Sequence, residues 1–202
     1  MMENEQIKIL MLGDHSVGKT SLEITFETGT FPTGYILHVF HSWEVQMIVE
    51  NIKFRIEIWD TKGENEYDNI RQLSYPHTDV FFICFSLVSK KSFQNIETKW
   101  IKEVQAHCPG TPCILVGLKS DLKKHFEENQ IQTNLNDDLD DSVKDQQPVS
   151  TEDIQRMKEK INAEYYFECS SKDKINITEL FESACRIKIR NEKEAKSKCF
   201  IF

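Results

Sequence analysis

A chain of 202 residues is long enough for one domain with a substantial core, and 39% hydrophobic with 29% charged residues is the balance of a soluble globular protein. No apolar run approaches the roughly 20 residues that a membrane span needs. The net charge of −8 argues against a nucleic-acid partner, and the six cysteines lack metal-ligand spacing, so we expect buried, reduced thiols.

Apolar runs and helical patterns alternate along the chain. Residues 7–12 form a short apolar run that precedes a glycine, which predicts a strand and then a loop. Residues 43–49 and 54–58 alternate between apolar and polar side chains on either side of the turn-like Glu50-Asn51. This pattern predicts a β-hairpin.

The later segments continue this alternation. Residues 80–85 and 113–116 are uninterrupted apolar runs, which is typical of strands buried on both faces of a parallel sheet, and residues 165–169 are a weaker strand candidate. Helical spacing relates three sets of apolar residues: Phe93, Ile96, Trp100 and Val104; Ile154, Met157 and Ile161; and Ile177, Leu180, Phe181, Ala184 and Cys185.

Together these elements predict an α/β domain over residues 5–185. We expect three layers: a six-stranded, mostly parallel sheet with one antiparallel hairpin edge, and helices on both faces. The segment at about 123–147 is polar and acidic and is interpreted as a surface insertion, because residues 126–145 hold seven acids and one lysine, a local charge of −6. Residues 186–198 hold six bases and two acids, a local charge of +4, within a basic C-terminal tail (186–202).

The stretch that follows the first strand matches the phosphate-loop pattern G-x-x-x-x-G-K-[ST]. Its backbone N–H groups would surround phosphate oxygens, Lys19 would reach the β and γ oxygens, and the Thr20 hydroxyl would bind Mg²⁺. The position of the motif between a strand and a helical stretch supports this interpretation. The nucleotide-contacting residues here are Gly13, Asp14, His15, Ser16, Val17, Gly18, Lys19, Thr20 and Ser21.

Three further motifs follow later in the chain: Asp60-Thr61-Lys62-Gly63, Leu118-Lys119-Ser120-Asp121 and Cys169-Ser170-Ser171-Lys172. In order and spacing, these and the phosphate loop resemble the motifs of the Ras superfamily of small GTPases. The stretches FPTGYILHVF, DNIRQLSYP and FECSSK and the insertion after Asp121 resemble the Rho branch. The resemblance covers residues 5–202 and implies a phosphate-loop small G domain, a monomer that binds GTP or GDP with Mg²⁺.

The resemblance assigns roles around the base. Asp121 would accept hydrogen bonds from the guanine N1–H and amino group, which adenine cannot supply, so an unpaired carboxylate would reject ATP. The Lys119 stem would lie over the base and Phe31 at its edge. The Ser171 N–H would meet the guanine carbonyl, with Ser170 and Lys172 alongside.

The family resemblance also assigns roles around the phosphates. Asp60 would hold Mg²⁺ through water, the Gly63 N–H would sense the γ-phosphate, and Tyr35 would cover the phosphates. Effectors would contact a surface made of Tyr35, Ile36, Leu37, His38, Val39, Phe40, His41, Ser42 and Trp43, together with the segment after Gly63.

Three positions depart from the family pattern where hydrolysis takes place. His15 replaces a glycine, and any Cβ there crowds the space shared by the attacking water and an activating protein's arginine. Glu64 replaces the glutamine that orients the water and puts negative charge beside the γ-phosphate. His38 replaces the threonine that ligates Mg²⁺, and imidazole is a poor ligand for this hard cation.

Two further departures lie nearby. Lys62 replaces an alanine and either approaches the metal site or points to solvent, with solvent favoured. Leu118 replaces an asparagine or threonine, so a polar brace to the phosphate loop is lost. The Rnd group of Rho-like proteins, which stays GTP-bound, departs at comparable places.

These departures favour a Rho-like signalling switch that recruits effectors, for example to the actin cytoskeleton, with slow or absent hydrolysis. Glu64 would be its catalytic residue only in a normally cycling GTPase, which remains an alternative. A pseudo-GTPase with weak nucleotide binding is another.

The last four residues, 199–202, form a C-a-a-X sequence, and a terminal Phe favours geranylgeranylation of Cys199. One lipid chain binds membranes weakly, so Lys188, Arg190, Lys193, Lys196 and Lys198 would supply a second signal. We therefore expect the protein at the cytoplasmic face of the plasma membrane or endomembranes, with a cytosolic pool. Exchange factors and a GDP-dissociation inhibitor are further expected partners.

Overall fold

The computed structural model describes residues 4–33, 42–133 and 148–199. Within them, six strands form one sheet in the order β2-β3-β1-β4-β5-β6, and each neighbouring pair is parallel except β2 and β3. The predicted mostly parallel sheet with an antiparallel hairpin at one edge is therefore confirmed. The strands are β1 (Asn4–Leu12), β2 (Ser42–Val49), β3 (Ile52–Asp60), β4 (Val80–Ser86), β5 (Cys113–Leu118) and β6 (Tyr165–Cys169).

The hairpin turns where the sequence predicts it. Glu50 and Asn51 both have positive φ, 51° and 65°, which is the conformation of the two-residue turn whose twist matches the adjoining strands. Val49 pairs with Ile52 across this turn. The register places the buried side chains of β3 on the core face and leaves Arg55 exposed.

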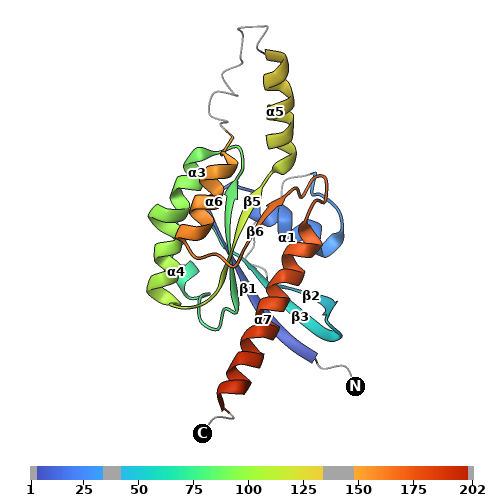
Figure 1. Cartoon of the computed structure of the whole chain (residues 1–202), viewed down its shortest axis with the longest axis vertical. Coiled ribbons are helices and arrows are strands. Elements are labelled where there is room, and N and C mark those ends of the chain that lie inside the picture. The colour runs from blue at the N-terminus through green and yellow to red at the C-terminus, as the bar shows by residue number, and fades with distance from the viewer. Residues whose placement is uncertain (1–3, 34–41, 134–147, 200–202) are drawn as a thin grey trace.

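Helices cover both faces of the sheet (Figure 1). Alternate residues of β1 face opposite sides, because successive side chains of a strand point to opposite faces. Ile9 and Met11 join the apolar cluster that includes α1 and α7, whereas Leu10 and Leu12 join the cluster that includes α3, α4 and α6. The three layers are thus confirmed. The helices are α1 (Lys19–Thr28), α2 (Asp68–Gln72), α3 (Lys90–Asn95), α4 (Ile101–His107), α5 (Ser120–Thr133), α6 (Thr151–Lys160) and α7 (Ile177–Cys199).

The three predicted apolar stripes are buried on helices. The first lies on α3 and α4 and on the single π-helical segment (Ile96–Trp100) that joins them. Its Trp100 is 0% exposed. The stripe on α7 packs onto α1, where the rings of Phe181 and Phe26 stack with centroids 3.7 Å apart. A short 3₁₀ turn (Asn65–Tyr67) precedes α2, and neither element was predicted.

The cysteines of the described core are free thiols, as predicted. Cys84, Cys113, Cys169 and Cys185 are buried, and Cys108 is half-buried. Burial raises the pKa of Cys84 to about 12, so this thiol stays protonated and unreactive at neutral pH.

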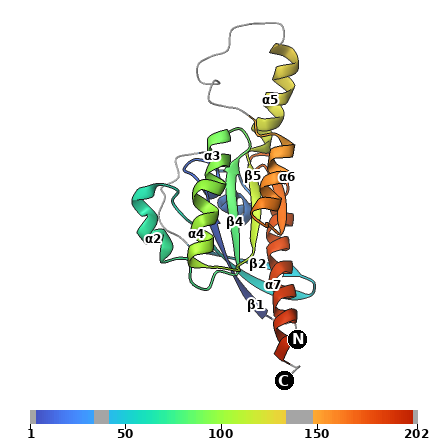
Figure 2. The same cartoon turned by 60° about the vertical axis from the view of Figure 1, so that its left-hand side comes forward.

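Two segments, the acidic insertion and the basic tail, differ in structure from what the sequence predicts. The acidic insertion begins inside helix α5, which extends away from the sheet in both views (Figures 1 and 2), and its residues 134–147 lie outside the described part of the chain. The basic tail begins inside helix α7, where Ile187 and Ile189 are 1% and 6% exposed. This part of α7 therefore packs against the domain. No helix in the described residues is long and apolar enough to cross a membrane.

Candidate nucleotide site

The phosphate loop connects β1 to α1 in a tight arc. Gly13 and Gly18 have φ of 156° and 116°, and a Cβ added at Gly13 would collide with the Cys84 carbonyl oxygen of β4. Lys19 spans the arc, since its Nζ donates to the carbonyl oxygens of Gly13 at 2.8 Å and Asp14 at 2.9 Å. Burial lowers the pKa of Lys19, and nearby acids, Asp60 first, oppose this shift. An ammonium group held inside such a loop is placed to bind phosphate oxygens.

The two residues predicted to hold the metal lie together. The Thr20 hydroxyl donates to Asp60 Oδ2, and Thr61 Oγ1 donates to the Met11 carbonyl oxygen at 2.7 Å, which fixes the end of β3 beside β1. This pair of hard oxygen ligands fits Mg²⁺, which is commonly bound through one or two protein oxygens plus substrate phosphates. Within the described ranges, no three His, Cys, Asp or Glu side chains gather as a metal cluster. His38 lies outside these ranges.

Gly63 lies directly against the phosphate loop. A Cβ built there would be 2.5 Å from both the Gly13 carbonyl oxygen and the His15 amide nitrogen. Only glycine permits this approach, and the contact of the Gly63 N–H with the γ-phosphate stays a prediction. The segment after Gly63 therefore starts in contact with the loop.

The base end of the site is assembled from three loops. Lys119 Nζ donates to the Ser16 carbonyl oxygen at 2.7 Å, and burial lowers the pKa of Lys119 while Asp121 opposes the shift. Ser170 Oγ, fully buried, donates to Asp121 Oδ1 at 2.7 Å and so holds the carboxylate that is predicted to read guanine.

The remaining predicted base contacts surround this pair. Ser171 is buried, Lys172 is exposed, and Phe31 and Ser21 are half-buried; Tyr35 lies outside the described residues. Leu118 is 1% exposed, and its Cδ1 would lie 3.7 Å from a Cβ at Gly18. An apolar contact therefore occupies the place of the polar brace that the family has between these loops.

The two departures at the phosphate end contact each other. His15 Nδ1 lies 2.8 Å from Glu64 Oε1, and the two side chains are 62% and 38% exposed. Sequence analysis identified each residue separately but gave no sign that they form a pair. The Lys62 ammonium lies 4.3 Å from the centre of the Tyr67 ring.

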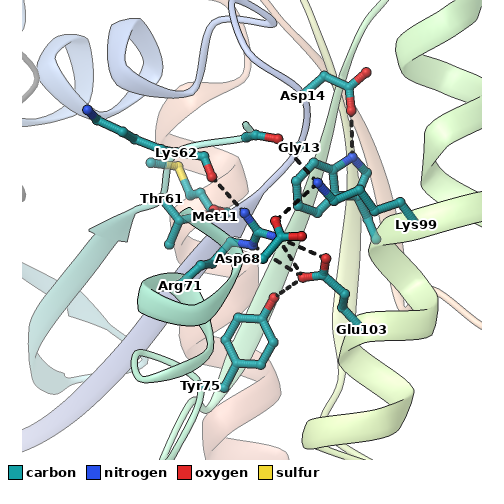
Figure 3. A network of polar contacts seen from close by, with 12 residues as sticks. Met11, Gly13, Asp14, Thr61, Lys62, Asp68, Arg71, Tyr75, Lys99 and Glu103 are labelled. Atoms are coloured by element: carbon teal, nitrogen blue, oxygen red, sulfur yellow. Dashed lines mark hydrogen bonds and ion pairs between the residues drawn. The ribbon is translucent and has the colours of Figure 1, made fainter. Parts of the chain in front are cut away.

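A buried polar network supports the segment after Gly63 from the α4 side (Figure 3). Arg71, 0% exposed, donates to both oxygens of Glu103, to Asp68 Oδ1 and to the Lys62 carbonyl oxygen. The Tyr75 hydroxyl donates to Glu103 Oε2 at 2.6 Å. Burial lowers the pKa of Arg71, but its hydrogen bonds to Glu103 and Asp68 more than offset this and raise it. The guanidinium is therefore permanently charged and paired with two carboxylates.

The Asp14 side chain ties the phosphate loop to α3 and to the π-helical segment. Its carboxylate accepts hydrogen bonds from Asn95 Nδ2 at 2.6 Å and Trp100 Nε1 at 2.8 Å, so the Asp14 side chain points toward α3 and the π-helical segment and only its backbone remains for phosphates. Sequence analysis missed Arg71, Glu103 and this contact, because charged residues without apolar periodicity resemble any solvated surface.

Glu23 was also missed, although it lies on α1 beside the site. It is 3% exposed, and its Oε1 has no hydrogen-bond partner among the described residues. Burial, reinforced by the charge of Asp60, raises the pKa of Glu23 to about 9. In the sequence Glu23 belongs to no motif, so nothing there marks it as buried.

The predicted effector surface and the basic tail lie only partly within the described residues. Residues 35–41 of the predicted effector region lie outside the described part, while Ser42 and Trp43 begin β2. Among the tail bases, Lys188 Nζ lies 2.7 Å from Asp79 Oδ1, and Arg190 donates to both oxygens of Glu164. These two cations are thus engaged within the domain. Cys199 ends α7, and residues 200–202 are not described.

Comparisons with known proteins agree with this geometry. Residues 8–190 match the family described as the Ras family. The GTP-binding protein RHO1 of Candida albicans is 40% identical over 198 residues, which cover 96% of this chain and 94% of that protein. The chain belongs to the Rho family of small GTPases. Rho-family proteins bind GTP or GDP with Mg²⁺, act as signalling switches, and generally engage effectors, exchange factors and dissociation inhibitors.

Proposed function

We propose that this Rho-family protein binds GTP with Mg²⁺ and acts as a long-lived, membrane-anchored switch because it hydrolyses GTP slowly. The observation that carries the proposal is the contact between His15 and Glu64, which occupies the side of the phosphate loop that faces the segment after Gly63. Nucleotide retention and slow hydrolysis have separate physical grounds.

Nucleotide retention is supported by the contacts of the loop and the base end. Lys19 is held inside the phosphate loop, Thr20 and Asp60 are brought together, and Asp121 is held by Ser170. Each of these groups offers the nucleotide or Mg²⁺ the atom type that its chemistry requires. Bound Mg²⁺ supplies neutralisation of phosphate charge, while Lys19 and the loop amides orient the phosphates.

Slow hydrolysis is supported by the same two residues that form the pair. In the family's chemistry, a glutamine amide at position 64 both donates to and accepts from the attacking water, whereas a carboxylate only accepts. Here Glu64 Oε1 is also engaged by His15, and the imidazole takes space that an activating arginine needs. Such an arginine is worth about 10³–10⁵ in rate, so its exclusion matters most.

The membrane anchor, the partners and the link to actin belong to the same proposal. A geranylgeranyl group on Cys199, with the exposed Lys193 and Lys196 nearby, would hold the protein at an anionic leaflet. Because Lys188 and Arg190 pair with acids of the domain, the electrostatic part of this anchor is weaker than the sequence alone implies. Effectors, including ones that act on the actin cytoskeleton, would bind around residues 35–43 and the segment after Gly63.

Single-turnover hydrolysis of loaded GTP tests the proposal. We expect a rate at or below about 10⁻⁴ s⁻¹ for the natural protein, with little stimulation by a Rho-type activating protein. The doubly substituted protein, His15→Gly with Glu64→Gln, should hydrolyse GTP at least about 10-fold faster and respond to the activator. A matched control carries His77→Gly with Glu159→Gln, two exposed positions outside the pair and outside the segment after Gly63.

Two results would contradict the proposal in different ways. Rapid, activator-stimulated hydrolysis by the natural protein would make it a normally cycling switch. Failure to retain any guanine nucleotide would make it a pseudo-GTPase.

A further inference from the structure

The contact between His15 and Glu64 joins two parts of the site that are remote in sequence. His15 belongs to the phosphate loop, and Glu64 follows the glycine that packs against that loop. In the family pattern neither position carries a charged or imidazole side chain. The two departures therefore create a side-chain link between these parts.

The placement of Glu64 needs a specific attraction. Its Oε2 is buried and has no hydrogen-bond partner within the described ranges, and burial of a carboxylate oxygen is unfavourable. Desolvation would raise the pKa of Glu64, but the backbone amide, His15, Lys19 and Lys62 outweigh it and lower the pKa. The carboxylate is thus ionised and drawn toward the phosphate loop.

The backbone beside Glu64 is held from the other side as well. Arg71 donates to the Lys62 carbonyl oxygen at 2.9 Å, and Lys99 Nζ lies 3.4 Å from the Gly63 carbonyl oxygen. Residues 62–64 thus lie between Arg71 of α2 and Lys99 of the π-helical segment on one side and His15 on the other.

We propose that His15 is a positioning residue for Glu64, and that the pair forms a brace which closes the phosphate loop onto the segment after Gly63. The brace turns the carboxylate toward the imidazole, away from an attacking water. This inference rests on the proposed function only for its consequence in hydrolysis. The contact and its mechanical effect stand apart from turnover.

The brace predicts a specific imidazole tautomer. Because Nδ1 faces the carboxylate, Nδ1 carries the proton when His15 is neutral. Long-range ¹H–¹⁵N spectra of the full-length protein loaded with GDP and Mg²⁺ report this tautomer. We expect the Nδ1–H form in the natural protein and in Glu64→Gln, whose amide oxygen still accepts. Glu64→Ala should lose it, and the exposed His77 should not respond in any variant.

Amide exchange provides the second measurement. His15→Ala and Glu64→Ala should each raise exchange of the amides of residues 62–66 by a factor of about 2–5, the range for an exposed ion pair. The double variant should exchange no faster than either single variant, because both remove the same contact. An unchanged tautomer in Glu64→Ala, or additive exchange rates, would overturn the brace.

These outcomes separate the brace from the proposed function. Fast hydrolysis with the predicted tautomer would contradict slow turnover and leave the brace intact. Slow hydrolysis without the tautomer would leave the proposed function standing and remove the brace as its cause.

Discussion

The two ends of the nucleotide site differ in how their residues relate to the family pattern. At the base end, Lys119, Asp121 and Ser170 keep the family's residue types and hold one another in place. At the phosphate end, His15 and Glu64 replace family residues and contact each other instead. The residues predicted to bind the base and the residues proposed to affect hydrolysis can therefore change independently within one fold.

The phosphate end also depends on a buried scaffold. Arg71 and Glu103 hold the segment after Gly63 on the helices behind it, and Asp14 ties the loop to Trp100. The proposed slow hydrolysis therefore does not require a loosely packed site, because these contacts hold the backbone that carries Glu64.

The largest expected effect comes from removing that scaffold. Arg71→Ala would leave Glu103 and Asp68 without their buried partner, and loss of one member of a buried ion pair costs about 3–5 kcal/mol. We expect this loss in the free energy of unfolding measured with denaturant. The control Arg156→Ala removes an exposed pair with Asp153 and should cost about 1 kcal/mol or less. Equal losses would mean that the network is not a scaffold.

A smaller effect is expected at the base end. Asp121→Ala should weaken GTP binding by about 10–150-fold, because a charged hydrogen-bond acceptor is worth about 1.5–3 kcal/mol, and should strengthen ATP binding slightly, because no unpaired carboxylate would then oppose adenine. Competition with a fluorescent guanine nucleotide measures both. Asp173→Ala is the control, since the Asp173 side chain is exposed. A parallel loss for GTP and ATP would show that Asp121 does not read the base.

The smallest expected effect is a gain in stability at Glu23. Its folded pKa of about 9 exceeds the ordinary value of 4.5, so between these values the folded state binds a proton that the unfolded state has released. Stability therefore falls as pH rises through this window. Glu23→Gln should raise the free energy of unfolding by about 1–3 kcal/mol at neutral pH, and by more toward pH 9.

Denaturant titrations at pH 6, 7.5 and 9 would measure the pH dependence at Glu23. The exposed Glu159→Gln should show no such trend. A gain that does not grow with pH would mean that Glu23 is ionised in the folded protein.

Sequence patterns predicted the sheet and the core because burial leaves a periodic signal. The runs in β4 and β5, the alternation in β3 and the turn at Glu50 and Asn51 all match the structure. Helices α2 and α5 were missed because neither has an apolar stripe: α2 is held by Arg71, and α5 extends away from the sheet.

The site was predictable where a motif fixes the chemistry and not where side chains meet through the fold. The phosphate loop, the Asp60 segment and Asp121 follow from their motifs, and their roles toward the nucleotide stay predictions. The pairing of His15 with Glu64, the inward turn of Asp14 and the burial of Glu23 depend on how β1, β3 and α4 pack. Spacing along the chain carries no record of these contacts.

The nucleotide carried by the protein purified from cells tests the central claim most directly. Chromatography of the released nucleotide should give mainly GTP, and this GTP should persist for hours in the presence of Mg²⁺. The protein with His15→Gly and Glu64→Gln should instead carry mainly GDP. Mainly GDP in the natural protein, with added GTP consumed at ordinary family rates, would contradict the account.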